Sequence, residues 1–370
     1  TAYEIPKRDW SSDVCSSDLK YLGSKRTLVP RIVALASALR DRAGARTASD
    51  LFCGTTRVAQ GLKGAGFTVT ANDMAAYAEV LATTYVEADG RRVRKRALAA
   101  KLAHLNALPG VDGYCTRTFC EDARFFQPFN GRRIDAIRAE IDRVADGRVE
   151  RAILLTSLLE AADRVDSTTG VQMAYLKQWA ARSFNPLVLR VPALLPGRGT
   201  AVCDDANALA ARMAEVDVAY LDPPYNQHSY RGNYHIWETL VRNDAPEAYG
   251  VARKRVDCRE VKSAYNSRAA AWSAFESLVR TVRARYLIVS FSDEGFFAQD
   301  AIAGLLEEVH GSVVAVPVSY KRYVGAKIGI YNPSGRKVGT VGRLTNREFL
   351  FVAGERVRGV LRGMKATCAA

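Results

Sequence analysis

The chain is short of the residues that build metal sites and disulfide frameworks. Its 370 residues include four His and seven Cys. The cysteine count is odd, no two cysteines form a CxxC pair, and no His clusters with a Cys. We therefore expect no bound metal and no set of disulfides. A reducing compartment, the cytoplasm, fits this composition best.

Long apolar runs are also absent. No stretch of about 18 apolar residues occurs, so we expect no membrane span. The N-terminal residues show no basic region followed by an apolar core and a small-residue cleavage site, so we expect no secretion signal. Hydrophobic residues make up 48% and charged residues 25% of the chain. These shares exclude disordered and fibrous classes, and the length allows one large domain or two of average size.

Positive charge is in excess. Lys and Arg number 53 against 39 Asp and Glu, which gives a net charge of +14. Such a surplus predicts a polyanionic partner, either nucleic acid or an anionic membrane surface, although solubility alone is the simpler alternative. Basic residues gather in Arg91–Lys101, Arg253–Arg255 and Lys321–Arg343. Together these clusters fit a surface that neutralises phosphates.

The first residues differ in character from the rest of the chain. Residues 8–19 read RDWSSDVCSSDL and have no apolar period. They resemble the in-frame translation of a sequencing-adapter oligonucleotide joined to a gene fragment, and an ordinary Ser- and Asp-rich tail is the alternative. We expect residues 1–19 to be a disordered artefact and leave them out of the fold.

The rest of the chain alternates strand and helix patterns typical of an α/β fold. Strand patterns occur at 48–52, 67–71, 200–203, 216–221, 286–292, 312–320 and 347–353, and helical patterns at 27–43, 58–65, 75–86, 134–144, 149–165 and 269–282. Residues 92–197 have the pattern of a mostly helical insertion, a type of segment that often holds recognition surfaces. We therefore expect one α/β domain made of 20–91 and 198–355, followed by a basic tail, 356–370.

A glycine turn follows the first predicted strand. The segment reads Asp50-Leu51-Phe52-Cys53-Gly54-Thr55-Thr56, and Asp73 ends the next strand 19 residues after Gly54. An acidic residue at this spacing suits the hydroxyls of a ribose, and the turn builds a ligand crevice at the carboxyl edge of the sheet. Thr55 and Thr56 stand where GxGxxG has later glycines. A nucleoside without a pyrophosphate, such as S-adenosylmethionine, is therefore the better ligand.

A second motif, Leu221-Asp222-Pro223-Pro224-Tyr225, follows a later strand. The two prolines fix the backbone, so that the Asp222 carboxylate and the Pro223 carbonyl can converge as acceptors on one exocyclic amine. Two acceptors on the hydrogens of adenine N6 would favour a pyramidal nitrogen with its lone pair aimed at a methyl donor. Tyr225 can stack on the base. A strand-ending turn in which Asp222 caps a helix is the structural alternative.

These segments resemble a known family. Asp222–Tyr225 is similar to the DPPY motif of amino-directed DNA methyltransferases, and Lys20-Tyr21-Leu22-Gly23-Ser24-Lys25 is similar to the amino-terminal motif of the Dam-like (D12 class) adenine-N6 enzymes. The motif order is that of their α group. The resemblance implies a Rossmann-like sheet that binds S-adenosylmethionine, with 92–197 as the target-recognition insertion and the α/β domain as the catalytic domain. It also implies catalytic roles for Asp222, Pro223, Pro224 and Tyr225, and cofactor contacts for Tyr21, Gly23, Lys25, Asp50, Phe52, Gly54, Asp73, Asp204 and Asp205.

Aromatic and basic residues interleave just after this motif. Tyr230, Tyr234 and Trp237 alternate with Arg231 and two histidines. Stacking on nucleic acid and contact with phosphate is one interpretation, and burial of Tyr234 and Trp237 in the core of a helix is the other. We interpret His228 and His235 as hydrogen-bonded structural residues and not as catalysts.

The implied reaction is methylation of the N6 amine of a flipped adenine in double-stranded DNA, in a restriction–modification or phage setting. Cytosine N4 is a close alternative target, because both amines suit the same acceptors, although Asp at position 222 in place of Ser favours adenine. RNA as a substrate stays open. A catalytically silent nucleic-acid-binding protein with the same fold is a further alternative. We expect a monomer, because such an enzyme can modify one strand at a time, and no membrane partner.

Overall fold

The computed structural model describes residues 19–224, 230–260, 263–293, 295–321, 330–331, 337–339 and 345–364. Residues 1–18, which make up nearly all of the predicted artefact, lie outside this range. The last residue of that segment, Leu19, is described and is buried in a hydrophobic cluster. Tyr225 and His228 also lie outside the described residues, as does most of the predicted basic loop 321–343.

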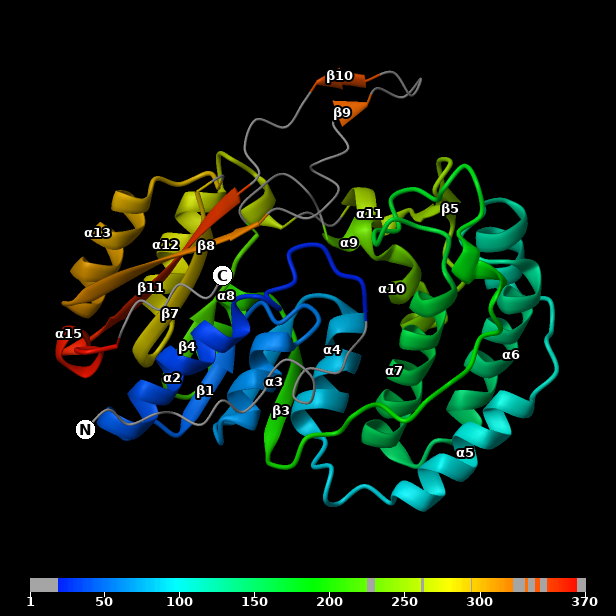
Figure 1. Ribbon diagram of the computed structural model, residues 1–370, viewed down its shortest axis with the longest axis horizontal. Helices are drawn as coiled ribbons and strands as arrows, with labels where there is room; N and C mark the ends of the chain where they lie inside the picture. The colour runs from blue at the N-terminus through cyan, green and yellow to red at the C-terminus, as the bar shows by residue number, and fades with distance from the viewer. Residues whose placement is uncertain are drawn as a thin grey trace.

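A seven-stranded sheet forms the centre of the protein (Figure 1). Its strand order is β3-β2-β1-β4-β7-β11-β8. The first five strands are parallel, and β11 lies antiparallel between β7 and β8. The strands are β1 (Thr47–Asp50), β2 (Thr68–Asp73), β3 (Gly199–Cys203), β4 (Val216–Leu221), β7 (Ala284–Ser292), β8 (Val313–Lys321) and β11 (Thr345–Gly354). The sheet confirms the predicted α/β class.

Apolar side chains project from both faces of this sheet, so helices cover both faces. In β7, Ile288 faces one hydrophobic cluster and Leu287 the other, as the two-residue period of a strand requires. The first cluster includes α2 (Val29–Ala43), α3 (Arg57–Gly64) and the short α15 (Val357–Val360). The second includes α8 (Ala206–Arg212), α12 (Ala271–Thr281) and α13 (Gln299–His310). Helix α13, between β7 and β8, was not predicted from the sequence.

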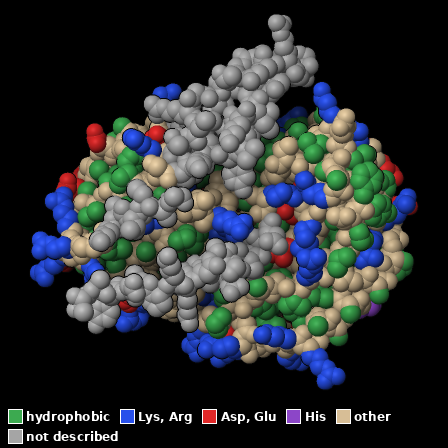
Figure 2. Space-filling view, viewed as in Figure 1, with side chains coloured by type: hydrophobic (Ala, Val, Ile, Leu, Met, Phe, Trp, Pro, Cys, Tyr) green, Lys and Arg blue, Asp and Glu red, His purple; other side chains and the backbone are tan. Residues whose placement is uncertain are grey.

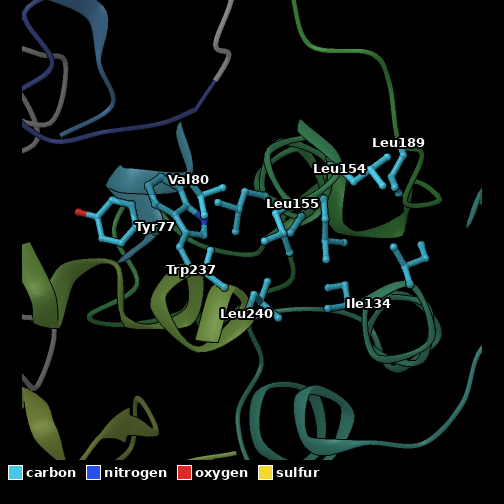
Figure 3. Packing of buried hydrophobic residues seen from close by; sticks show 14 of the residues in the cluster. Tyr77, Val80, Ile134, Leu154, Leu155, Leu189, Trp237 and Leu240 are labelled. Carbon is cyan, nitrogen blue, oxygen red and sulfur yellow. The ribbon is translucent and has the colours of Figure 1, made fainter. Parts of the chain in front are cut away.

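A third hydrophobic cluster lies beside the sheet and contains the helices that come after β2. These are α5 (Lys95–Ala107), α6 (Pro128–Val144) and α7 (Gly147–Val165), with π-helical turns at Thr83–Glu87 and Thr116–Glu121. Two helices of the α/β part, α4 (Ala76–Ala82) and α10 (His235–Arg242), contribute to the same cluster. Figure 3 shows Tyr77, Val80, Trp237 and Leu240 in this cluster together with Leu155 of α7. Helix α4 connects the helical part to the sheet, because Tyr77 lies in this third cluster and Ala82 in the first.

The second half of the predicted insertion is less helical than expected. Residues 166–198 contain one 3-10 turn, Ala181–Phe184, and otherwise extended or bent chain. Pro186, Pro192 and Pro196 interrupt this segment and disfavour a continuous helix. The segment is anchored by side chains instead, since Asn130 Nδ2 donates to the Asn185 carbonyl at 2.9 Å and Ser157 Oγ donates to the Arg190 carbonyl at 2.6 Å.

Smaller elements complete the described chain. They are α9 (Tyr230–Asn233), β5 (Ala248–Tyr249), β6 (Lys254–Arg255), α11 (Asp257–Glu260), a 3-10 turn at Ala264–Asn266, β9 (Ile330–Tyr331) and β10 (Lys337–Gly339). The pairs β5–β6 and β9–β10 are antiparallel. Among the described residues, no helix has the length and apolar character needed to cross a bilayer.

The packing of α6 predicts that a cavity at Ile137 destabilises the protein. Ile137 has no exposed surface and lies in the third cluster, so Ile137→Ala leaves a cavity. We expect the free energy of unfolding to fall by about 2–5 kcal/mol, measured by urea denaturation. Val111→Ala, at a side chain that is 49% exposed, is the control and should change it by less than about 0.5 kcal/mol. Equal losses for the two variants would show that α6 does not pack as described.

Candidate active site

One pocket opens at the carboxyl edge of the parallel strands. It is lined by residues that come after β1, β2, β3 and β4 and by the segment before α2. In an open α/β sheet this edge is where the chain leaves room for a ligand. The pocket brings together every predicted site residue that the structure describes: Tyr21, Gly23, Lys25, Asp50, Phe52, Gly54, Asp73, Asp204, Asp205, Asp222, Pro223 and Pro224.

The glycine turn after β1 is held under an aromatic ring. Gly54 has a φ of +47°, a conformation that side chains other than glycine rarely adopt. A Cβ at this position would lie 3.0 Å from the Tyr21 hydroxyl and 3.2–3.3 Å from its ring carbons. Gly23 is equally constrained, since its Cβ would lie 2.5 Å from the Tyr230 hydroxyl. Both glycines therefore allow tyrosines to close one wall of the pocket.

Asp73 and Asn72 tie the ends of neighbouring strands together. The Asp73 carboxylate accepts from the Gly54 amide at 2.9 Å and from the Ala75 amide at 3.1 Å. Asn72 Nδ2 donates to the Leu51 carbonyl at 3.2 Å and to the Asp204 carbonyl at 3.1 Å. The turn after β1 is thus shaped by residues of β2, because parallel strands end side by side.

The Asp222-Pro223-Pro224 segment leaves β4 next to the N-terminal segment. Lys25 Nζ lies 3.1 Å from Asp222 Oδ1 and also pairs with the Glu348 carboxylate of β11. The side chains of Lys25 and Glu348 are 8% and 1% exposed, so this ion pair is shielded from solvent. The alternative that Asp222 merely caps a helix is not what the structure shows, because its carboxylate faces Lys25 within the pocket.

Burial and like charges shift the acids of this pocket. Burial raises the pKa of Asp222 to about 6, with Glu348 adding to the rise and Lys25 opposing it. Burial and the charge of Asp222 also raise the pKa of Asp50 well above its usual range. Within the described residues, Asp50 Oδ1 and the Tyr220 hydroxyl are buried in the pocket wall without a hydrogen-bond partner. Such atoms are costly unless a ligand supplies the missing partner.

The two acids after β3 differ in their surroundings. Asp204 pairs with Arg212 and accepts from the Asp205 amide at 2.8 Å. Asp205 caps α8, accepting at Oδ1 from the amides of Asn207 and Ala208, each at 3.0 Å. The Tyr265 hydroxyl donates to Asn207 Oδ1 at 2.7 Å. The Tyr265 ring packs edge to face against the Phe52 ring, with centroids 5.2 Å apart. This end of the pocket combines carboxylate and aromatic surfaces.

The aromatic run after Pro224 forms core structure. Tyr234 and Trp237 are buried, and their rings stack with centroids 4.6 Å apart. The Tyr234 ring also stacks on the Tyr21 ring, with centroids 4.5 Å apart. The interpretation that they stack on nucleic acid is therefore wrong for these two residues. His235 is buried, with Nε2 2.9 Å from the Gln172 carbonyl, and burial lowers its pKa to about 3. It is a structural histidine, as predicted.

The predicted phosphate-contacting clusters are only partly available to a ligand. Arg255 is 3% exposed and pairs with Asp244 at 2.6 Å, so including it in a phosphate-contacting surface was wrong. Lys101 pairs with Asp146 at 2.9 Å. Arg92, Lys95 and Arg96 are among the exposed residues of the first cluster. Figure 2 shows Lys and Arg side chains spread over much of this face of the molecule, with Asp and Glu far fewer.

Sequence reasoning missed several residues of the site. Tyr77 and Tyr265 line the pocket from α4 and the 3-10 turn at Ala264–Asn266, and Glu348 contacts Lys25 from β11. The tyrosines carried no sequence signal, because isolated aromatic residues usually pack in the core. Glu348 did carry one, since it is an acid inside the apolar pattern of residues 347–353.

The fit of Tyr21 over Gly54 predicts a specific loss of stability. Gly54→Ala and Gly44→Ala each place a side chain at positive φ, which costs about 1–2 kcal/mol. Only Gly54→Ala also displaces Tyr21, because a Cβ at Gly44 meets nothing within 4 Å. We expect a larger fall in melting temperature for Gly54→Ala, measured by calorimetry. Equal falls for the two variants would contradict the described contact.

Comparisons with known proteins agree with this architecture. A family model described as D12 class N6 adenine-specific DNA methyltransferase matches residues 21–292. The Type II methyltransferase M.NlaIII of Neisseria lactamica is 31% identical over 289 residues, covering 75% of this chain and 84% of that protein.

Two longer proteins are also similar. Modification methylase StsI of Streptococcus sanguinis is 29% identical over 322 residues, with 82% of this chain and 49% of StsI covered. The Type II methyltransferase M.FokI of Planomicrobium okeanokoites is 29% identical over 324 residues, covering 82% and 48%. The chain thus spans about half the length of these two relatives. Since the family model covers most of the sheet and the pocket-lining segments, the chain belongs to the D12 class of N6 adenine-specific DNA methyltransferases.

Proposed function

We propose that the chain transfers a methyl group from S-adenosylmethionine to the N6 amine of adenine in DNA, as the modification enzyme of a restriction–modification or phage system. The observation that carries this proposal is the pocket itself. Asp222 and the two prolines share it with the Gly54 turn, Asp50 and Asp73. An acceptor for an amine therefore lies beside a crevice suited to a nucleoside, which is the arrangement that direct methyl transfer needs.

The residues present fit the methyl donor. The buried Asp50 Oδ1 lacks a partner among the described residues and suits the ammonium of the methionine end, with Phe52 and Gly54 beside it. The remaining lone pairs of Asp73 can accept from ribose hydroxyls. Of Asp204 and Asp205, we assign Asp205 to the amine of the adenine ring of S-adenosylmethionine, because Asp204 pairs with Arg212. S-adenosylmethionine, when bound, supplies an electrophilic methyl group on its sulfonium.

Tyr21, Gly23 and Lys25 complete this arrangement from the N-terminal segment. Tyr21 covers the glycine turn, Gly23 leaves room for Tyr230, and Lys25 orients Asp222. We assign the first two to the wall of the cofactor pocket. Lys25 lies closer to the target-base side, because its ammonium contacts Asp222 directly.

Asp222 and Pro223 handle the target amine in this proposal. Adenine N6 is a weak nucleophile because its lone pair is delocalised into the ring. The Asp222 carboxylate and the Pro223 carbonyl each accept a hydrogen bond from one of its two N–H groups, which favours a pyramidal nitrogen. After methyl transfer the nitrogen is cationic and acidic, and its proton leaves to Asp222 or to water. Tyr225, which lies outside the described residues, is assigned to stacking on the base.

An adenine within a duplex cannot enter such a pocket, so the base must flip out, at a cost of a few kcal/mol. We assign DNA contact to the exposed basic residues and target recognition to the insertion 92–197, with 20–91 and 198–355 as the catalytic domain. Of the predicted basic tail, 356–370, Val357 in α15 packs against this domain. Double-stranded DNA is then the partner, and we infer a monomer acting in the cytoplasm.

Methyl transfer tests the proposal. We expect the chain to transfer label from S-adenosylmethionine to unmethylated duplex DNA and to yield N6-methyladenine on nucleoside analysis. Asp222→Asn should lower the rate by about 100-fold or more, because the amide cannot accept both the hydrogen bond and the proton. Asp217→Asn is the matched control, since Asp217 lies on β4, the strand that precedes Asp222, and does not line the pocket. No transfer by the parent chain, or N4-methylcytosine as the product, would overturn the proposal.

The rate should also depend on pH. Because the pKa of Asp222 is raised to about 6, its carboxylate becomes protonated as the pH falls through that value. We expect the rate constant at saturating substrates to be constant from pH 7 to 8 and to fall below about pH 6, measured in single-turnover assays. A rate that stays constant down to pH 5 would contradict the assignment of Asp222 as the acceptor.

A further inference from the structure

Glu348 is a buried acid on the strand that runs against the others. It is 1% exposed, and it lies near the start of β11, opposite Ser292 of β7. The next residues of the same face, Leu350 and Val352, belong to the hydrophobic core. Because β11 is antiparallel to β7, its start lies at the edge where the parallel strands end. This reversal brings Glu348 to Lys25, which lines the pocket.

Burial of such a carboxylate is costly unless other groups compensate it. Contacts with described residues do so here, since the Lys25 ammonium pairs with Glu348 and Ser290 Oγ donates to Glu348 Oε1. Lys25 Nζ is then shared between Glu348 and Asp222, the latter at 3.1 Å. The three side chains come from the N-terminal segment, the end of β4 and β11, so the tertiary fold alone assembles them.

Among the residues that the structure describes, the charges that face Asp222 are unequal in number. Lys25 is the cation, and Glu348, Asp50 and the ionisable Tyr220 act with Asp222 on the other side. A single ammonium that serves two carboxylates cannot neutralise both. Glu348 thus keeps Lys25 in place and at the same time withholds part of its charge from Asp222.

We propose that Glu348 is a positioning residue of the methyl transfer, holding the Lys25 ammonium against Asp222 so that the Asp222 carboxylate points at the target amine and keeps its strength as an acceptor. Ser290 orients Glu348 in turn. This inference rests on the proposed function, because it gives Glu348 a role in the reaction assigned to Asp222. The charge of Glu348, and not only its shape, therefore matters to the reaction.

The test is Glu348→Gln, which keeps the size and an oxygen for Lys25 but removes the charge. Glu348 raises the pKa of Asp222, so its neutralisation should lower that pKa. We expect the acid limb of the single-turnover rate to move to lower pH by about one unit. A uniform loss of rate in Glu348→Gln with an unmoved limb would reduce Glu348 to a structural residue and overturn the proposal.

A second measurement needs neither cofactor nor DNA. In the folded parent the pKa of Asp222 is raised, so its contribution to stability is lost as pH rises through about 6. The gain in melting temperature from Asp222→Asn should therefore increase with pH between the ordinary value of 3.8 and about 6, with a midpoint near 5, and level off above about 6. In a Glu348→Gln background that midpoint should fall by about half a unit and the total gain should be smaller, because only the folded-state pKa changes and a double-mutant cycle reports this coupling between neighbours. An unchanged midpoint would overturn the coupling.

Glu160→Gln is the matched control for both measurements. Glu160 is also buried, but it accepts from Tyr85 in the helical part and should leave both profiles unmoved. The two assays separate the failures. A parent chain that transfers no methyl group overturns the proposed function and the catalytic role of Glu348 together. A parent chain that is active while both midpoints stay fixed overturns only the role of Glu348.

Discussion

The structure depends on a concentration of buried and half-buried acids at one edge of the sheet. Asp50 and Asp73 end β1 and β2, Asp222 follows β4, and Glu348 lies near the start of β11. Lys25 is the ammonium placed between Asp222 and Glu348. Parallel strands force their carboxyl ends to the same edge, so residues after them must lie close together. Each acid then needs a partner, which explains the backbone amides on Asp73 and the ion pair on Asp222.

The same edge joins the sheet to the helical part. Tyr21 covers the Gly54 turn and stacks on Tyr234, which stacks on Trp237 of α10. Trp237 in turn belongs to the hydrophobic cluster that holds α6 and α7. Lys20 extends this connection, since its Nζ lies 3.0 Å from Asp166 beyond the end of α7. A displacement of the helices would therefore reach the pocket through packed rings and an ion pair.

Local patterns predicted most of the elements. The apolar run of β7 and the helices α6 and α7 were recognisable because each has a period of its own. The tandem prolines located the turn after β4, and the glycine turn located the crevice after β1. The helical content of 166–198 was overestimated, because three prolines and side-chain anchors outweigh its composition. The roles of Tyr234 and Trp237 stayed open, because a sequence does not tell which face of a short helix is buried.

By itself, the sequence determined the α/β class, the family resemblance and the set of acids and glycines that line one pocket. Those features depend on residues close together in the chain or on the shared edge of parallel strands. Only the tertiary structure decided which acids share a cation. Lys25 and Glu348 are 323 positions apart, and they meet because β11 inserts antiparallel between β7 and β8. That insertion is a property of the whole sheet, and strand order has no signature within any single strand.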